Sequence, residues 1–250
     1  MNRGIYTLTS GGIAALARLD AVAQNLANVG TAGYKAERLV FQVKPLERAA
    51  NAGATPLQPA LARTAAQVTE VATIRDFTPG PVRASANPLD VAMNGNGFFA
   101  VSTPRGERYT RQGSFARDPE GYLVTQHGER VQGDGGDIQL PDGSVAIGED
   151  GTIAVDGSSV GRLKVVAFGE TPALVPEGAA LFAPARGTVP EVLDATAVRL
   201  QPGAVEGANV DAASGMIELI DVMRGFETYM HAMQRLDEVV QRSITDVGRV

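Results

Sequence analysis

The residues best suited to chemistry in this chain are acidic side chains in its middle. Asp134, Asp137 and Asp142 lie close together in the sequence, and Ca²⁺ prefers oxygen ligands of this kind. Their spacing, however, does not match an EF-hand loop. Asp142, Asp150 and Asp156 each precede a glycine between alternating apolar runs, which is typical of hairpin turns because these turns need positive φ. We therefore predict turns here rather than a metal site.

Other candidates for a reactive site are equally weak. The two histidines, His127 and His231, lack the spacing of metal or triad motifs, so we interpret them as surface or packing residues. Gly95 and Gly97 resemble a phosphate-binding loop only superficially, and we interpret them as a turn that admits the next two phenylalanines to the core. No G-x-S-x-G, H-E-x-x-H or P-loop motif occurs. We predict no enzyme, no cofactor, no metal or catalytic residue and no small-molecule substrate.

Composition excludes further classes. The chain has 250 residues, of which 44% are hydrophobic, and its 29 Gly and 14 Pro favour many turns and short strands. A net charge of −6 with no basic cluster argues against a nucleic-acid partner. No stretch approaches the roughly 18 apolar residues that span a bilayer, so we predict a protein that is not membrane-inserted. The first residues lack the features of a cleaved secretory leader.

Each end of the chain carries a heptad seam, in which apolar residues alternate at spacings of three and four. This period predicts one helix from about 10 to 28, with a less regular lead-in, and another from about 211 to 247. Met216, Ile220, Met223 and Met230 form a second stripe beside the C-terminal seam. Because an exposed seam needs a partner, we predict subunit-assembly contacts at Leu8, Ala15, Leu19, Val22, Leu26, Leu219, Val222, Phe226, Tyr229, Met233 and Leu236.

The middle of the chain has no such period and reads as short β-branched runs separated by Gly, Pro, Asn and Asp. The predicted fold is a mainly β central domain of short strands and hairpins, with N- and C-terminal α-helices that pack in a coiled-coil-like terminal domain. We place the discontinuous helical domain at 1–35 and 205–250. An extended arm or linker is predicted at 36–70, and the β domain at 71–204.

Three motifs, in order, resemble the flagellar rod and hook proteins, the axial proteins of the bacterial flagellum. They are LANVGTAGYK at 26–35, NPLDVAMNGNGFFAVST at 87–103 and the tail VEGANVDAASGMIELIDVMRGFETYMHAMQRLDE at 205–238. The stretch 109–133 is similar to the continuation of the family's central domain. The chain departs from the family at Gly215, where a glutamate is usual, which puts the first turn of the C-terminal helix in question. The family-signature turn comprises Asn25, Asn28, Gly33 and Tyr34.

The resemblance implies a structural subunit of the flagellar basal-body rod. It also implies a periplasm-spanning location, export through the flagellar type III apparatus without a cleaved leader, and partners that are other rod subunits and further copies of the chain. The length and the single modest body favour a rod protein over the larger hook protein, and the proximal rod type over the distal one. Such a subunit would polymerise through its terminal helices into the helical axial drive shaft.

A different class stays open on the residues alone. The chain could be a soluble β-rich binding module whose terminal helices pair with each other inside one molecule. The two classes differ in where the apolar seams find their partner: in a neighbouring subunit, or in the same chain.

Overall fold

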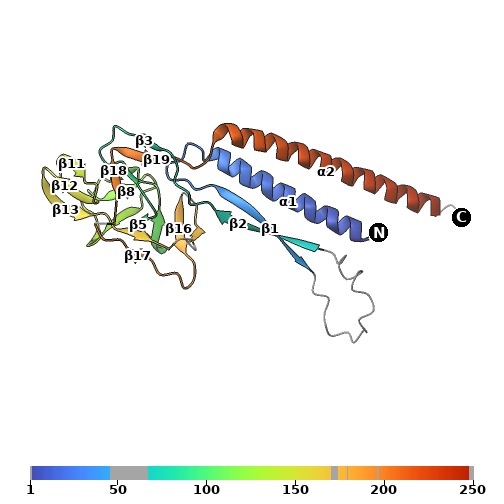
Figure 1. Cartoon of the computed structure of the whole chain (residues 1–250), viewed down its shortest axis with the longest axis horizontal. Coiled ribbons are helices and arrows are strands. Elements are labelled where there is room, and N and C mark those ends of the chain that lie inside the picture. Colours follow the sequence, from blue (N-terminus) through green and yellow to red (C-terminus); the bar gives the residue numbers. More distant parts are fainter. Residues whose placement is uncertain (1, 46–66, 170–173, 179, 196, 248–250) are drawn as a thin grey trace, which may run out of the picture. The chain divides into compact units, whose positions relative to one another are not determined.

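The computed structural model describes residues 2–45, 67–169, 174–178, 180–195 and 197–247 (Figure 1). The chain divides into two compact units. The first comprises residues 1–27, 37–76 and 211–250, and the second comprises residues 28–36 and 77–210.

The first unit contains both helices and a two-stranded ribbon. Helix α1 (Asn2–Ala27) and helix α2 (Ala212–Val247) run side by side in opposite directions (Figure 1). Strands β1 (Glu37–Pro45) and β2 (Gln67–Arg75) pair antiparallel, with Glu37 opposite Arg75. The bounds of α2 agree with the prediction to within one residue. The predicted mainly β fold with a helix at each end is confirmed.

Helix α1 is regular where the sequence predicted an irregular lead-in. Gly11 and Gly12 are poor helix formers, yet both lie inside α1. The ring of Tyr229 from α2 occupies the space beside them, and a Cβ on Gly11 would overlap that ring. Close packing of α2 against a glycine face therefore outweighs the weak propensity of those two residues.

The second unit is built from short antiparallel strands. Its largest sheet has the order β15-β16-β6-β5-β9-β8-β7, with β10, β14 and β17 attached to it, while β11-β12-β13, β18-β4 and β19-β3 form smaller sheets. Their bounds are β3 (Val82–Ala84), β4 (Val91–Met93), β5 (Phe98–Thr103), β6 (Gly106–Thr110), β7 (Phe115–Arg117), β8 (Leu123–Thr125), β9 (Arg130–Gly133), β10 (Gly136–Asp137), β11 (Val145–Ile147), β12 (Thr152–Val155), β13 (Ser158–Arg162), β14 (Val165–Ala167), β15 (Leu174–Pro176), β16 (Leu181–Pro184), β17 (Glu191–Val192), β18 (Leu200–Pro202) and β19 (Ala204–Glu206).

Strand β5 divides the core of this unit. Successive side chains of a strand point to opposite faces, so Phe99 and Val101 join the larger apolar cluster while Phe98 and Ala100 join a smaller aromatic one. The ring of Phe99 meets that of Phe115 edge to face at 5.3 Å. The two phenylalanines after Gly97 are thus core residues, as the sequence predicted.

The aspartate-rich segment forms turns and ion pairs. Asp156 and Gly157 have φ values of 48° and 81° and join β12 to β13, which confirms one predicted Asp-Gly hairpin. Asp150-Gly151 lies in the turn between β11 and β12, whereas Asp142-Gly143 lies in a bend that precedes β11 rather than in a hairpin.

Each member of the acidic cluster has an arginine partner. The ion pairs are Asp134 with Arg162, Asp137 with Arg130, and Asp142 with Arg117. Among the described residues, no three His, Asp or Glu side chains form a group that could hold a metal ion.

Substitution of Phe99 by Ala tests the core of the second unit. Phe99 is fully buried, so its truncation should lower the free energy of unfolding by about 3–5 kcal/mol through lost burial and a cavity. Urea unfolding followed by circular dichroism measures this change. Val189→Ala is the control, because Val189 is 82% exposed and should change stability by less than about 0.5 kcal/mol. Equal effects of the two variants would contradict the assigned core.

Candidate assembly surface

The inner face of the helix pair contains most of the predicted seam. Val22 and Val222 are buried, and the other described seam residues are half-buried. This second group is Ala15, Leu19, Leu26, Leu219, Phe226, Tyr229 and Met233. The side chains of Leu8 and Leu236 lie outside the described residues.

Small residues hold a groove open between α1 and α2. The groove measures about 290 Å³ and brings together predicted residues from both helices, namely Ala15, Val222 and Phe226. Its remaining walls are Ala14, Arg18, Asp221 and Gly225. Because alanine and glycine leave space where larger side chains would fill it, the two helices approach each other without closing the groove.

The outer face of the pair is apolar and exposed. On α2 it comprises Met216, Ile217, Ile220, Met223, Met230 and Val239, and on α1 it comprises Ile13 and Leu16. We call these residues the outer stripe. The second stripe of the sequence analysis lies within it. Ile13, Leu16, Ile217 and Val239 are further exposed apolar residues that the sequence analysis did not single out. An exposed apolar surface of this kind marks an interaction site.

Among the described residues of the two helices, Arg18 Nη2 forms an ion pair with Glu218 Oε1 at 2.9 Å. Both side chains are about half exposed, and exposed pairs contribute about 0–1 kcal/mol. Apolar packing rather than this pair therefore holds the helices together.

The signature turn connects α1 to β1 through specific backbone contacts. Asn25 donates from Nδ2 to the carbonyl of Glu37, and the amide of Glu37 donates to Asn25 Oδ1, each at 2.8 Å. The hydroxyl of Thr31 donates to Asn28 Oδ1, and its amide donates to the Asn28 carbonyl. The side-chain amides of Asn25 and Asn28 thus supply hydrogen-bond partners for residues beyond the end of α1.

Gly33 and Tyr34 seat the same turn on the second unit. Gly33 has a φ of +67°, and a Cβ there would lie 2.5 Å from backbone atoms of Arg111 and Gln112. Only glycine combines this conformation with so close an approach. Tyr34 is 6% exposed, and its carbonyl accepts a hydrogen bond from the amide of Asn209. Four residues of the signature therefore act as structural elements of the turn.

Next to the turn lies a buried ionic cluster that the sequence did not reveal. Lys35 Nζ lies 2.6 Å from Glu206 Oε1 and donates to the Thr78 carbonyl at 2.8 Å. Arg111 Nη1 lies 3.6 Å from Glu206 Oε2, and Arg111 Nη2 donates to the Gly95 carbonyl. Lys35, Arg111 and Glu206 are each at most 2% exposed.

Burial determines the electrostatics of this cluster. Desolvation lowers the pKa of Arg111, and the negative charge of Glu206 opposes that shift. The carboxylate of Glu206 therefore contacts two buried cations. No local pattern in the sequence signals the pairing, because Lys35 and Glu206 are 171 residues apart.

Helix α2 begins at a well-formed cap despite the unusual Gly215. The amide of Ser214 donates to Asp211 Oδ2 at 2.8 Å, and the amide of Gly215 donates to the Asp211 carbonyl. A side-chain oxygen that accepts from the third helical amide is the usual N-cap arrangement. Gly215 also lies against Leu26, whose Cδ1 would be 3.6 Å from an added Cβ. The glycine therefore does not prevent the first turn.

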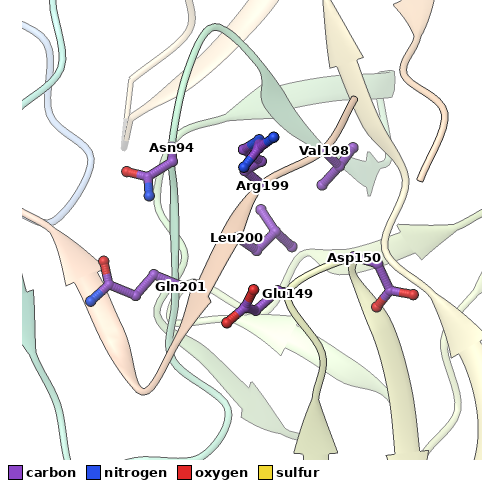
Figure 2. Close-up of a pocket in the computed structure, with 7 residues that line it drawn as sticks. All are labelled: Asn94, Glu149, Asp150, Val198, Arg199, Leu200 and Gln201. Atoms are coloured by element: carbon purple, nitrogen blue, oxygen red, sulfur yellow. The ribbon is translucent and has the colours of Figure 1, made fainter. Parts of the chain in front are cut away.

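A polar groove of about 540 Å³ lies elsewhere, beside β18 in the second unit (Figure 2). Its lining residues are Asn94, Glu149, Asp150, Val198, Arg199, Leu200 and Gln201. Asp150 accepts hydrogen bonds from the amide and hydroxyl of Thr152, so its carboxylate is already used by a turn. Figure 2 shows the polar side chains at separate places around Leu200 rather than converging on one point. This arrangement does not form a catalytic centre.

Comparisons with known proteins identify similar chains. Three family models match, described as "Flagella basal body rod protein" over residues 5–35, "Flagellar hook protein FlgE/F/G D1 domain" over 92–155 and "Flagellar basal body rod FlgEFG protein C-terminal" over 201–246. The flagellar basal-body rod protein FlgF of Caulobacter vibrioides is 31% identical over the full length of both chains. FlgF of Escherichia coli is 33% identical over 97% of each chain, and the rod protein FlgG of Bacillus subtilis is 29% identical over 98% of each. In the described part of the chain, neither helix has the length and apolar character needed to cross a membrane.

Gly33→Ala should disrupt the signature turn. The new Cβ would clash with the backbone at Arg111 and would force an L-residue into positive φ, so the free energy of unfolding should fall by more than about 1 kcal/mol. Gly30→Ala is the matched control, since nothing lies within 4 Å of a Cβ at that position. Chemical denaturation of both variants measures the difference, and a tolerated Gly33→Ala would refute the close approach.

The cap of α2 should respond to acid. Hydrogen bonds from Ser214 lower the pKa of Asp211, so the cap stabilises the folded state above the unfolded pKa. That stabilisation is lost as the pH falls through the lowered folded pKa. Helicity measured by circular dichroism should therefore decline in acid. Asp211→Ala, which has no carboxylate at the cap, should show a smaller decline than the unchanged protein. Glu227→Ala, on the exposed middle of α2, should show the same decline in helicity as the unchanged protein. Equal pH profiles for the two variants would exclude the cap as the cause.

Proposed function

Because this chain belongs to the flagellar basal-body rod protein family, we propose that it polymerises through its two terminal helices into the helical axial drive shaft of the flagellum. Family membership makes it a structural subunit of the basal body that assembles with other rod proteins. The resemblance to the FlgF type, ahead of the FlgG type, is confirmed. The manner of polymerisation is our proposal.

The observation that carries the proposal is the outer stripe. Met216, Ile220 and Met223 are each about half exposed although they belong to a regular, apolar helix face. A soluble monomer gains nothing from leaving such a face in water, whereas burial of apolar area contributes about 25 cal/mol per Å². A helix of a neighbouring subunit is the natural cover for this surface.

The groove between the helices supports a second contact. Ala15 and Phe226 keep exposed area beside it, so these seam residues can contact a neighbour as well as each other's helix. We therefore propose that the predicted seam residues, from Leu8 to Leu236, and the outer stripe together form the assembly surface. Two different patches that meet between copies give a heterologous contact, and such a contact generates a helical tube when it does not close.

Location and export follow from the family resemblance. We propose a rod that spans the periplasm and a subunit that passes through the flagellar type III export apparatus without a cleaved leader. The helices are marginal without tertiary packing, which would let the terminal segments travel extended and order on incorporation.

The alternative is a soluble binding module whose terminal helices pair within one chain. The pairing of α1 with α2 in a single molecule fits that class, but the exposed outer stripe does not, because self-pairing leaves it uncovered. Family membership also favours the rod subunit.

Ile220→Asp should block assembly without unfolding the helix pair. Ile220 is 50% exposed, so the monomer tolerates a charge there, whereas a buried interface would lose apolar area and gain an unpaired carboxylate. We expect unchanged helicity by circular dichroism, together with loss of the subunit from purified basal bodies and loss of motility. Val189→Asp, on an exposed site of the β domain, should assemble normally. Normal incorporation of Ile220→Asp would contradict the proposed surface.

A further inference from the structure

The segment 94–97, which joins β4 to β5, contains the same dipeptide twice in different surroundings. Asn94 and Asn96 are the asparagines of this chain that precede a glycine. In such a pair the glycine amide nitrogen can attack the side-chain carbonyl carbon of the asparagine, because glycine has no Cβ to hinder the approach. Both asparagines are exposed, and neither belongs to the core or to the proposed assembly surface. Their side chains are therefore available for chemistry.

The reacting groups of Asn94 and Gly95 are unobstructed. Gly95 is exposed, and nothing lies within 4 Å of a Cβ built on it. Within the described part of the chain, the Asn94 side chain forms no hydrogen bond and the Gly95 amide donates to no acceptor. Figure 2 shows the Asn94 amide at the polar groove beside β18, apart from the other polar side chains there. Ring closure at this pair therefore breaks no described hydrogen bond of the two groups.

The second pair differs at its glycine. Gly97 is buried, and a Cβ there would lie 2.7 Å from Met93 Sδ and 3.0 Å from Val165 Cγ1. Ring closure requires a base to remove the proton of the glycine nitrogen and requires that nitrogen to move toward the asparagine side chain. A nitrogen packed among core side chains meets these conditions only after local opening, which slows the reaction according to the free energy of opening.

We propose that Asn94 is a site of spontaneous deamidation and that the fold protects Asn96 from the same reaction. The Gly95 nitrogen loses its proton and bonds to Cγ of Asn94. The Cγ–Nδ2 bond breaks, and the departing nitrogen takes up that proton and leaves as ammonia. Water then opens the succinimide ring: cleavage of the new bond gives aspartate, and cleavage of the original peptide bond gives isoaspartate. The inference concerns one chain and does not depend on polymerisation.

Either product adds a negative charge to the groove beside β18. The ionisable side chains that line it are two carboxylates, Glu149 and Asp150, and one guanidinium, Arg199, with a formal sum of −1. A carboxylate at position 94 makes this sum −2. The groove therefore becomes more acidic as the protein ages.

Isoaspartate has a second effect, because it inserts a methylene into the main chain directly before Gly95. The Gly95 carbonyl accepts a hydrogen bond from Arg111 Nη2 at 2.7 Å, and Arg111 is 2% exposed. Displacement of that carbonyl would leave a buried cation with one acceptor fewer, which is costly in a dry interior. The isoaspartyl form should therefore be less stable than the unmodified protein.

Incubation of the folded full chain in mildly alkaline buffer, followed by peptide mapping with mass spectrometry, tests the site. Conversion at Asn94 should be at least about tenfold faster than at Asn96, which reacts only through local opening. In urea that unfolds the chain, the two rates should converge. Absence of conversion at Asn94, equal rates in the folded chain, or a difference that persists in urea would each overturn the proposal.

Two matched variants assign the change in charge, which isoelectric focusing detects as an acidic species. Asn94→Gln lengthens the side chain and disfavours the five-membered ring, so the folded variant should lose most of the early acidic species. Asn96→Gln is the control and should form that species at the rate of the unchanged protein. The Asp-Gly pairs do not interfere, because ring opening there returns an acid and adds no charge. An undiminished acidic species in Asn94→Gln would refute the assigned site.

The isoaspartyl form, separated by chromatography, tests the effect on Arg111. It should unfold at a lower urea concentration than the unmodified protein. Asn94→Asp carries the same charge on an unaltered main chain and should unfold close to the midpoint of the unmodified protein. Equal midpoints for the isoaspartyl form and Asn94→Asp would show that the Gly95 carbonyl keeps its place, which contradicts the inferred loss of the Arg111 contact.

Discussion

The carboxylate of Glu206, buried between two cations, is the interaction on which the layout of the chain depends. It joins residues 35, 111 and 206, which are far apart in the sequence, at one dry point. Removing water from three charged groups is costly, and good geometry with further hydrogen bonds offsets that cost only when every group is in place. The backbone contacts of Gly33 and Asn209 surround this point. The chain segment that leaves α1 and the one that leads into α2 are consequently fixed in the same part of the β body.

The two units differ in how far they bury their apolar side chains. In the second unit, β5 is buried on both faces, and its alternating side chains fill two separate clusters. In the first unit, α1 and α2 bury one face against each other and leave the other exposed. This difference supports the proposal that assembly involves the helix pair rather than the β body. The weak, exposed ion pair of Arg18 with Glu218 adds little to this division.

Local signals in the sequence were enough for the elements but not for their long-range contacts. The cap at Asp211 and the heptad period located α2, and Asp156-Gly157 located a hairpin, because each depends on neighbours within a few residues. The regular start of α1 was missed, since it relies on the Tyr229 ring covering Gly11. Strand β2 begins at Gln67, before the predicted β domain, because its apolar residues pair with β1 rather than with the body. The pairing of Lys35 with Glu206 has no local signature at all.

The positions of the methionines connect the helix geometry to the proposed assembly. Leu219, Phe226 and Met233 recur every seven residues on the inner face, and Met216, Met223 and Met230 recur every seven residues on the outer face. Since residues three apart lie on neighbouring lines of a helix, one α2 carries two parallel seams. The outer seam is made of flexible, polarizable side chains that adapt to surfaces of different shape. The proposed assembly would bring other rod proteins against this adaptable outer stripe, whereas the inner seam, which packs mainly against the other helix of the same chain, can use the rigid rings of Phe226 and Tyr229.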